Sequence, residues 1–476
     1  MNKLVTFFQR LSNIKDDKLL VKKYYDKQII PTVNASTTTY YNQQRKNPSK
    51  IICFAPFKNM YFSRHGEVFV CCHNRNYAIG KYPTQNIKEI WNGEKAIQIR
   101  QHIVQNNLSM GCQICQLDID KQLYSEVKAN HFDQLPLHLE YPTMMEFELD
   151  ITCNLECTMC SGEFSSSIRK NREFTAPFVS NYDDTFVEQL TEFIPYLHET
   201  RFSGGEPFLI PIYLTIWEKI VSINPSCLIS LQTNGTVLNS KIKSILEKGR
   251  FEIGISLDSL QKDIFEAIRV NAKFETVRQN INYFSDYCKR KKTPLRFSMC
   301  VMRNNWKEMA EYLDFCYQHN AYASFHKVSQ PIELGIRYLN SDELNKIYIY
   351  LKAYQFNNTF DTYISQQNLK HYYNYVEQIR IWRDKQIVNE QKRGNDLDKL
   401  KQDLFHTVSL NLSDNKQQAV IFGKLNEILC VYSEETQKKL LLKLQQTDVL
   451  LIIQRIQFFS KEDLIEEIKT LYGICR

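Results

Sequence analysis

Short alternating segments that indicate β-strands recur through the middle of the chain, with helical patterns between them. Strands are predicted at 144–151, 199–204, 227–233, 251–258, 296–302 and 323–328. Helical patterns lie between them at 183–197, 211–221, 240–249, 273–292 and 305–320. Strands separated by helices of about 10 to 20 residues are typical of β-α-β units and a parallel sheet. Six such units predict the α/β class, with a partial (β/α)6 barrel similar to a TIM barrel over 140–332.

The predicted strands alternate between apolar and polar residues, whereas parallel strands buried on both faces are apolar throughout. One face then collects polar residues from all six strands: Glu148, Asp150, Thr152, Arg201, Ser203, Ser230, Gln232, Ser256, Asp258, Ser298, Cys300 and His326. A dry core would leave many of these groups unpaired, so this face is predicted to line a wet lumen that holds a ligand. An error of one residue in register would exchange the two faces, and this alternative stays open.

The flanking regions have different patterns. Residues 1–50 indicate a helix followed by a polar linker or arm, "NASTTTYYNQQRKNPSK". Residues 51–135 contain five cysteines and two glycine turns, which predict a small cysteine-dependent module. Residues 335–476 are mostly amphipathic helix without a catalytic motif, and we expect a helical cap, partner surface or substrate-docking domain there.

Composition narrows the setting. A chain of 476 residues is too long for one ordinary domain, and the excess of 60 basic over 53 acidic residues is too mild to imply nucleic acid. Charged residues interrupt the N-terminal segment, which therefore lacks the continuous apolar core of a signal peptide. No apolar run approaches the ~20 residues that span a membrane. We therefore expect a cytoplasmic protein without membrane partners. In that compartment the 14 cysteines would be metal ligands, catalytic groups or core residues instead of disulfides.

Three cysteines, Cys153, Cys157 and Cys160, follow the first predicted strand with the spacing C-x-x-x-C-x-x-C. The irons of iron-sulfur clusters take cysteine thiolates, and a metal site keeps a position open where it binds substrate or cofactor. The motif therefore predicts an iron-sulfur cluster with one iron not ligated by protein. A zinc site completed by a distant residue, or purely structural thiols, are the alternatives.

This motif on the first loop of an α/β barrel resembles the radical S-adenosylmethionine (SAM) enzymes, and further elements match that family in order. "SGGEPF" is similar to its Gly-Gly-Glu-Pro motif, which implies that the strand end and Glu206 hold the methionine amino group of SAM. "QTNGT" and "SLDS" stand where the family contacts ribose, and "VMRNNWKEM" where it often has an asparagine. The resemblance thus implies that SAM is bound by Ser203, Gly204, Gly205, Glu206, Pro207, Thr233, Asn234, Ser256, Asp258 and Asn304 or Asn305, with Met159 in place of the usual aromatic residue near adenine.

A second set of cysteines, Cys53, Cys71, Cys112 and Cys115, would fully ligate a 4Fe-4S cluster, with Cys72 as the alternative to Cys71. The set resembles the twitch module, a shortened relative of the SPASM module that carries auxiliary clusters in radical SAM maturases and dehydrogenases. That module normally follows the barrel, whereas here it precedes it. The resemblance implies one auxiliary cluster, and structural zinc is the alternative.

The resemblance also implies the chemistry. Electron transfer from the first cluster would cleave SAM to methionine and a 5'-deoxyadenosyl radical, which abstracts hydrogen from substrate. Cys300, on the predicted polar face, is a candidate hydrogen donor, although a buried apolar role is the alternative.

The expected partners are a peptide or protein substrate, which the enzyme would modify or crosslink, and an electron donor such as flavodoxin or ferredoxin. A dehydrogenase or epimerase of a small metabolite is one alternative function. A zinc-stabilised, non-redox binding protein is the other.

Overall fold

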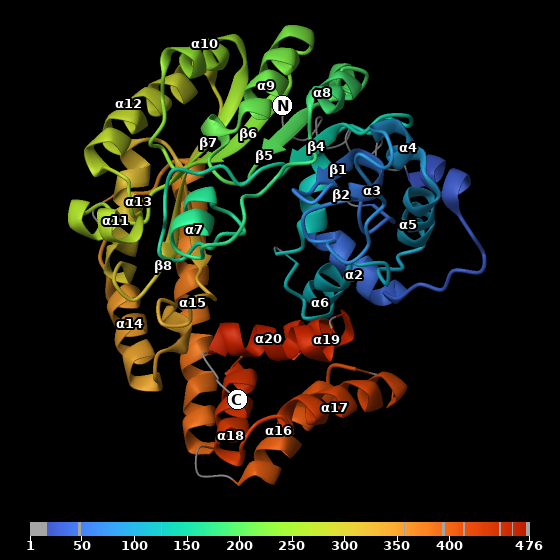
Figure 1. Ribbon diagram of the computed structural model, residues 1–476, viewed down its shortest axis with the longest axis vertical. Helices are drawn as coiled ribbons and strands as arrows, with labels where there is room; N and C mark the ends of the chain where they lie inside the picture. Colours follow the sequence, from blue (N-terminus) through green and yellow to red (C-terminus); the bar gives the residue numbers. More distant parts are fainter. Residues whose placement is uncertain are drawn as a thin grey trace. The chain divides into compact units, whose positions relative to one another are not determined.

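The computed structural model describes residues 17–472, except 46–48, 125, 357, 393–395, 413–414, 447–448 and 459. Residues 1–16 of the predicted N-terminal helix and the last four residues of the chain lie outside the described part. Figure 1 shows the helices and strands of the chain, which divides into two compact units. The first comprises the chain up to Ser256 together with Arg269–Leu295, and the second comprises Leu257–Ile268 together with the chain from Arg296 onward.

The first unit contains seven strands of a mostly parallel sheet. They are β1 (Asn59–Phe62), β2 (Glu67–Phe69), β3 (Gly80–Lys81), β4 (Met144–Phe147), β5 (Glu199–Phe202), β6 (Leu228–Thr233) and β7 (Arg250–Ser256). Their order in the sheet is β3-β2-β1-β4-β5-β6-β7. The neighbouring pairs β1–β4, β4–β5, β5–β6 and β6–β7 are parallel, whereas β1–β2 and β2–β3 are antiparallel. Four predicted strands are thus confirmed in a parallel sheet, whereas β1 to β3 were not predicted.

The register confirms the polar face within this unit. Tyr61 pairs with Glu146, Glu146 with Arg201, Arg201 with Ser230, and Ser230 with Glu252. Register partners on neighbouring strands point to the same face of a sheet. The predicted positions Glu148, Arg201, Ser203, Ser230, Gln232 and Ser256 therefore share the face of this row.

The opposite face of the sheet is aromatic and buried. The rings of Phe62 and Phe147 stack at 5.6 Å, and those of Phe147 and Phe202 at 4.8 Å. Phe186 from α8 (Asp184–Leu190) and Trp217 from α9 (Pro211–Ile223) meet this row edge-on. Burial of these rings provides the main hydrophobic contact between sheet and helices.

Helices complete the first unit. They include residues 17–24 and α2 (Ala35–Gln44), α3 (Ala55–Lys58), α4 (Ile87–Asn92), α5 (Glu94–Val104), α6 (Gln113–Asp120), α7 (Ser166–Asn171), α10 (Ser240–Lys248) and α12 (Phe274–Lys291), with short 3-10 helices η1 (Lys128–Gln134), η2 (Ile194–Tyr196) and η3 (Pro207–Leu209).

The expectation of a linker over the polar segment that begins at Asn34 is wrong, because α2 occupies most of it. The Asn34 side chain caps the helix by accepting from the Thr37 amide. Tyr41 is fully buried and donates to Asn130 Oδ1 at 2.6 Å. The buried tyrosine and the cap stabilise a helix that the polar composition concealed.

The second unit contains two parallel strands and many helices. Strand β8 (Leu295–Val301) enters it and pairs with β9 (Tyr322–Lys327), and Cys300 lies opposite His326 in register, as the polar face predicts. The helices are α11 (Lys262–Ile268), η4 (Trp306–Glu308), α13 (Met309–Gln318), η5 (Ile336–Tyr338), α14 (Ser341–Ala353), α15 (Tyr363–Lys392), α16 (Leu397–Ser409), α17 (Asn415–Leu429), α18 (Glu434–Gln446), α19 (Val449–Phe458) and α20 (Lys461–Tyr472).

The predicted helical C-terminal region is confirmed. Helices α16 to α20 share a core of leucine, isoleucine and valine that includes Leu404, Leu429 and Leu440. Within the described ranges, no helix combines the length and apolar character needed to cross a membrane.

Candidate active site

The loop after β4 holds the three cysteines of the first motif. Cys157 is buried, and Cys153 and Cys160 are half-buried. The Cys160 amide donates to the Cys157 carbonyl at 3.0 Å, and the Cys153 amide to Ser166 Oγ at 3.1 Å. Ser166 is the first residue of α7, so this helix fixes one end of the loop.

The three sulfurs lie close enough to influence one another electrostatically. Burial, with Glu206 and the other two thiols nearby, raises the pKa of Cys153 to about 11. Burial and Cys157 also raise the pKa of Cys160, while Arg269 opposes that rise. The Arg269 guanidinium donates to Cys157 Sγ at 3.7 Å. Grouped thiols that ionise reluctantly without a cation suit an iron-sulfur group, whose iron takes thiolate ligands.

Gly204 and Gly205 let two backbone segments approach each other at this loop. Gly204 has φ of +121°, and a Cβ there would lie 2.4 Å from the Asp150 carbonyl oxygen. A Cβ on Gly205 would lie 2.1 Å from the Thr152 carbonyl oxygen. The Glu206 amide donates to the same oxygen at 2.7 Å. Only glycine permits this approach, so the predicted Gly-Gly-Glu-Pro segment lies directly against the start of the cysteine loop.

Glu206 connects that segment to the end of β6. Its carboxylate is fully buried and accepts hydrogen bonds from Thr233 Oγ1 at 2.7 Å, the Asn234 amide at 2.6 Å and the Phe208 amide at 3.2 Å. Burial raises the pKa of Glu206 to about 7, although these three donors lower it. The carboxylate therefore positions neighbouring backbone, and a direct contact with SAM stays a prediction.

Asn234 brings the end of β6 to the cysteine loop. Its Nδ2 donates to Asn154 Oδ1 at 2.9 Å and lies 4.0 Å from Cys153 Sγ. Asn154 in turn donates to Thr236 Oγ1 at 3.0 Å. At the end of β7, Ser256 Oγ accepts from Gln232 Nε2 at 3.0 Å. The structure thus brings together the following predicted residues of the first unit: Cys153, Cys157, Cys160, Gly204, Gly205, Glu206, Thr233 and Asn234. Met159, Ser203 and Pro207 are their neighbours in the sequence, and their contacts with SAM stay predictions.

The remaining predicted SAM-binding residues and the candidate hydrogen donor Cys300 lie in the second unit. Asp258 is fully buried and its Oδ1 accepts from the Cys300 amide at 2.7 Å. Asn305 is also fully buried and donates to the carbonyls of Asp258 and Cys300 at 2.8 and 2.9 Å. Asn304 is exposed and Cys300 half-buried. Asn305 therefore links the ends of two segments, while Asn304 is the one of the pair with its side chain accessible.

The second cysteine set lines a pocket in the N-terminal module. Cys53, Cys71, Cys112 and Cys115 are among the residues that line a pocket of about 400 Å³, a volume that includes space open to solvent, and Cys72 is not part of the lining. Burial raises the pKa of Cys53 to about 12 and that of Cys115 to about 11, and raises the pKa values of Cys71 and Cys112 well above the usual range. Among the described residues, no three His, Cys, Asp or Glu side chains are arranged to hold a single metal ion.

The chemistry of this pocket fits a 4Fe-4S cluster. Four cysteines line one pocket, and Asn74 Nδ2 donates to Cys112 Sγ at 3.3 Å. Hydrogen bonds to the ligand sulfurs are one way in which proteins tune such clusters. The pocket lining favours Cys71 over Cys72 as the fourth ligand.

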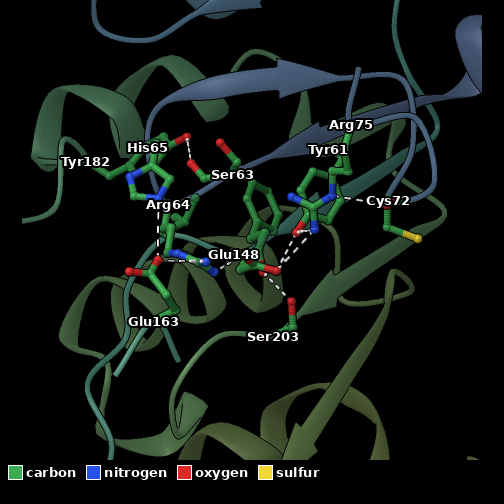
Figure 2. Close-up of polar contacts among 12 residues, drawn as sticks. Tyr61, Ser63, Arg64, His65, Cys72, Arg75, Glu148, Glu163, Tyr182 and Ser203 are labelled. Carbon is green, nitrogen blue, oxygen red and sulfur yellow. Dashed lines mark hydrogen bonds and ion pairs between the residues drawn. The ribbon is translucent and has the colours of Figure 1, made fainter. Parts of the chain in front are cut away.

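A polar network on the sheet face, which sequence reasoning missed, joins the module to β4 (Figure 2). Glu148 accepts from Tyr61 OH at 2.5 Å, Arg64 Nη1 at 2.6 Å and Arg75 Nη2 at 3.3 Å. Arg64 also reaches Glu163, in the segment after the three cysteines, at 3.2 Å. Burial and the Glu148 carboxylate raise the pKa of Tyr61. Only Glu148 carried a sequence signal, because β1 is too short to show alternation.

Comparisons with known proteins find two domain matches in this chain. The radical SAM superfamily profile matches residues 151–316, and the profile of an iron-sulfur cluster-binding domain, SPASM, matches residues 53–116. A GTP 3',8-cyclase of Streptomyces coelicolor is 28% identical over 29% of this chain and 40% of its own length. A cysteine-type anaerobic sulfatase-maturating enzyme of Clostridium novyi is 30% identical over 28% of this chain and 38% of its own length. The chain thus spans about two fifths of the length of these curated relatives.

Solved structures show a weaker likeness. Streptococcus suis SuiB bound to precursor peptide SuiA is 13% identical, with 54% of this chain and 59% of that chain covered and a TM-score of 0.34. A TM-score this low gives no support to a shared activity.

Proposed function

We propose that this chain, which contains a radical SAM domain over residues 151–316 and an SPASM iron-sulfur cluster-binding domain ahead of it over residues 53–116, is a maturase that modifies or crosslinks a side chain of a peptide or protein. The two domains imply 4Fe-4S clusters and SAM as cofactors. The observation that carries the proposal is the pocket lined by four cysteines, in the same unit as the loop that offers only three. One cluster with an open iron and one fully ligated cluster is the combination that the resemblance associates with maturases and dehydrogenases.

The two sulfur sets have different roles in this proposal. Cys153, Cys157 and Cys160 would hold the cluster that binds SAM, and the four pocket thiols would hold one auxiliary cluster. When bound, the first cluster would supply the electron that cleaves SAM to methionine and a 5'-deoxyadenosyl radical, which removes hydrogen from the substrate, and the auxiliary cluster would accept an electron back from the substrate.

The chain's own residues prepare the SAM site. Gly204 and Gly205 let the strand end lie directly against the start of the cysteine loop, where the methionine part of SAM is proposed to bind. Arg269 donates a hydrogen bond to Cys157 Sγ at 3.7 Å and so places positive charge beside the proposed cluster position. Cys157 is buried, which limits the access of water from that side of the loop. Thr233, Asn234 and Ser256 are the proposed contacts to the rest of SAM.

Residues of the second unit have proposed roles that rest on the resemblance. Asp258 and Asn304 are proposed SAM contacts, and Cys300 is the proposed hydrogen donor. The helices from α14 onward are the proposed docking region for the peptide. The C. novyi relative, whose name describes maturation of a sulfatase, supports a protein substrate.

A small-molecule substrate is the second candidate. The match to GTP 3',8-cyclases favours it, because their names describe action on a nucleotide. Dehydrogenation or epimerisation of a small metabolite belongs to the same class.

Anaerobic purification and SAM cleavage test the enzyme itself. Two 4Fe-4S clusters predict about eight irons per chain, and reduction with dithionite should yield 5'-deoxyadenosine. Cys157→Ala should abolish this product, whereas Cys227→Ala, at a buried thiol outside both sets, should retain it. A colourless protein with stoichiometric zinc would contradict the proposal and support the non-redox binding protein.

Substrate class requires a separate experiment. The reconstituted enzyme is incubated with SAM and a short peptide encoded beside its gene, and the peptide is analysed by mass spectrometry. Loss of two hydrogens, or a new crosslink, supports the maturase. Stimulation of SAM cleavage by GTP or a sugar alcohol, with the peptide unchanged, would favour the second candidate.

A further inference from the structure

An exposed basic and apolar segment follows the cysteine loop of the radical SAM domain. It comprises the end of α7 and the loop after it, residues 169–179, and Figure 1 shows α7 with this loop. Phe174 is 84% exposed and Val179 81% exposed. Phe174 also has φ of +51°, a conformation that bulky residues rarely adopt. An exposed aromatic side chain on a strained backbone is typical of a functional surface.

This segment is directly connected to Cys157. Arg172 is exposed, and its Nη1 donates to the Cys157 carbonyl oxygen at 3.2 Å. The neighbouring segment 269–273 reaches the same cysteine, because Arg269 donates to Cys157 Sγ at 3.7 Å. An incoming electron at this surface would therefore be separated from a cluster ligand by one arginine side chain and one hydrogen bond.

Glu156 holds the two segments side by side. Its Oε1 accepts from Asn171 Nδ2 at 2.8 Å and from Asn271 Nδ2 at 3.0 Å. The Glu156 amide also donates to the Val270 carbonyl at 3.1 Å. The two segments thus form one continuous surface, which we call the α7 surface, defined by residues 169–179 and 269–273.

The α7 surface carries more positive than negative charge. Its basic residues are Arg169, Lys170, Arg172, Arg269 and Lys273, and the acidic residues in and beside it are Glu156, Glu163 and Glu173. The acidic side chains are engaged: Glu156 by the two asparagines, Glu163 by Arg64, and Glu173 by the Gly162 amide at 2.7 Å. The basic side chains of Lys170, Arg172 and Lys273 are exposed. An apolar centre with a basic rim suits a partner whose matching patch is acidic.

We propose that the α7 surface is the docking site of an acidic one-electron carrier protein, such as a flavodoxin or ferredoxin, which reduces the group held by Cys153, Cys157 and Cys160. This inference rests on the proposed function. The reduced flavin or iron-sulfur group of the carrier loses one electron, the cysteine-bound group gains it, and no bond forms or breaks. A carrier is favoured over a peptide substrate because the surface leads to the backbone of a cluster ligand.

Two reductants separate docking from catalysis. The holoenzyme is reduced either by dithionite, a small anion that needs no docking surface, or by NADPH, flavodoxin reductase and flavodoxin, and 5'-deoxyadenosine is measured. The variants are Lys170→Glu with Lys273→Glu, and Phe174→Ser. The matched control reverses two exposed lysines of α10, Lys241→Glu with Lys248→Glu.

The double reversal on the α7 surface should lower the flavodoxin-driven rate about tenfold at low ionic strength, because charge complementarity governs encounter. The dithionite-driven rate should stay within about twofold, and the α10 control should keep both rates. Salt near 0.5 M should bring the wild-type rate down toward that of the variant, since it screens surface charge.

Equal losses with both reductants, or no loss with flavodoxin, would overturn the docking site while leaving the enzyme proposal intact. If the wild-type protein fails to cleave SAM even with dithionite, the proposed function fails instead. Direct binding of flavodoxin, followed by its FMN fluorescence, still decides the docking question in that case. Binding weakened by the α7 reversal and not by the α10 reversal supports the site, and unchanged binding refutes it.

Discussion

The backbone amide of Asn234 donates to the buried carboxylate of Glu206 at 2.6 Å, and this bond joins the Gly-Gly-Glu-Pro segment to the strand end beside Cys153. Burial places the pKa of Glu206 at about 7, above the 4.5 of an exposed glutamate. Between these values the folded chain binds more protons than the unfolded chain. The contribution of Glu206 to the free energy of unfolding is therefore complete below pH 4.5 and is lost as the pH rises through about 7.

Glu206→Gln should remove that pH dependence, because glutamine does not titrate. Urea unfolding of the metal-free chain at several pH values between about 5 and 8 measures it. The slope of stability against pH should be steeper in the wild type than in the variant. Equal slopes would show that the carboxylate stays ionised throughout.

Gly205→Ala should destabilise the chain by about 1 to 3 kcal/mol, because its Cβ would lie 2.1 Å from a backbone oxygen that cannot move freely. SAM binding should weaken as well, since the glycine segment would move away from the cysteine loop. Gly423→Ala is the matched control: nothing lies within 4 Å of its added Cβ, and helix α17 should become slightly more stable. Urea unfolding measures the stability of both variants, and SAM titration measures their affinity for SAM. Equal stability and equal affinity in the two variants would contradict the prediction.

Cys112→Ala should reduce the iron content from about eight to about four per chain, because a pocket ligand is lost while the three-cysteine loop is intact. Cys72→Ala should keep about eight irons, since Cys72 does not line the pocket. Iron analysis and the electron paramagnetic resonance spectrum of the reduced protein distinguish the two variants. A fall to about four irons in Cys72→Ala as well would make Cys72 the fourth ligand in place of Cys71.

Asn305→Ala should cost about 1 to 3 kcal/mol of stability, because it leaves the buried carbonyls of Asp258 and Cys300 without their donor. Asn304→Ala changes an exposed side chain and should cost less than about 0.5 kcal/mol. If Asn304 contacts SAM as proposed, its variant should instead weaken SAM binding. Thermal unfolding and SAM titration together assign the roles of this pair.

The strands and cysteine sets were accessible from sequence because each has a periodic or spaced signal. Ser230 and Gln232 alternate with apolar neighbours on β6, and the register confirmed the face they share. Thiol spacing likewise identified both sulfur groups, since few other residues hold iron-sulfur clusters.

Other features depend on tertiary contacts that no local pattern encodes. Helix α2 owes its burial to Tyr41 and its bond to Asn130 across 89 residues. Tyr61, Arg64 and Arg75 meet Glu148 only because β1 pairs with β4. The choice between Asn304 and Asn305, adjacent and identical in type, likewise required the fold.

The parallel pairing of β1 with β4 also explains why the cysteine module is tied to the radical SAM domain. On one side β4 bonds to β5, and on the other it bonds to β1 from Met144 to Phe147. A fragment that starts after the module would present the backbone groups of β4 as a bare, apolar edge, which promotes strand-to-strand aggregation. The N-terminal module therefore protects one edge of the sheet that carries the three-cysteine loop.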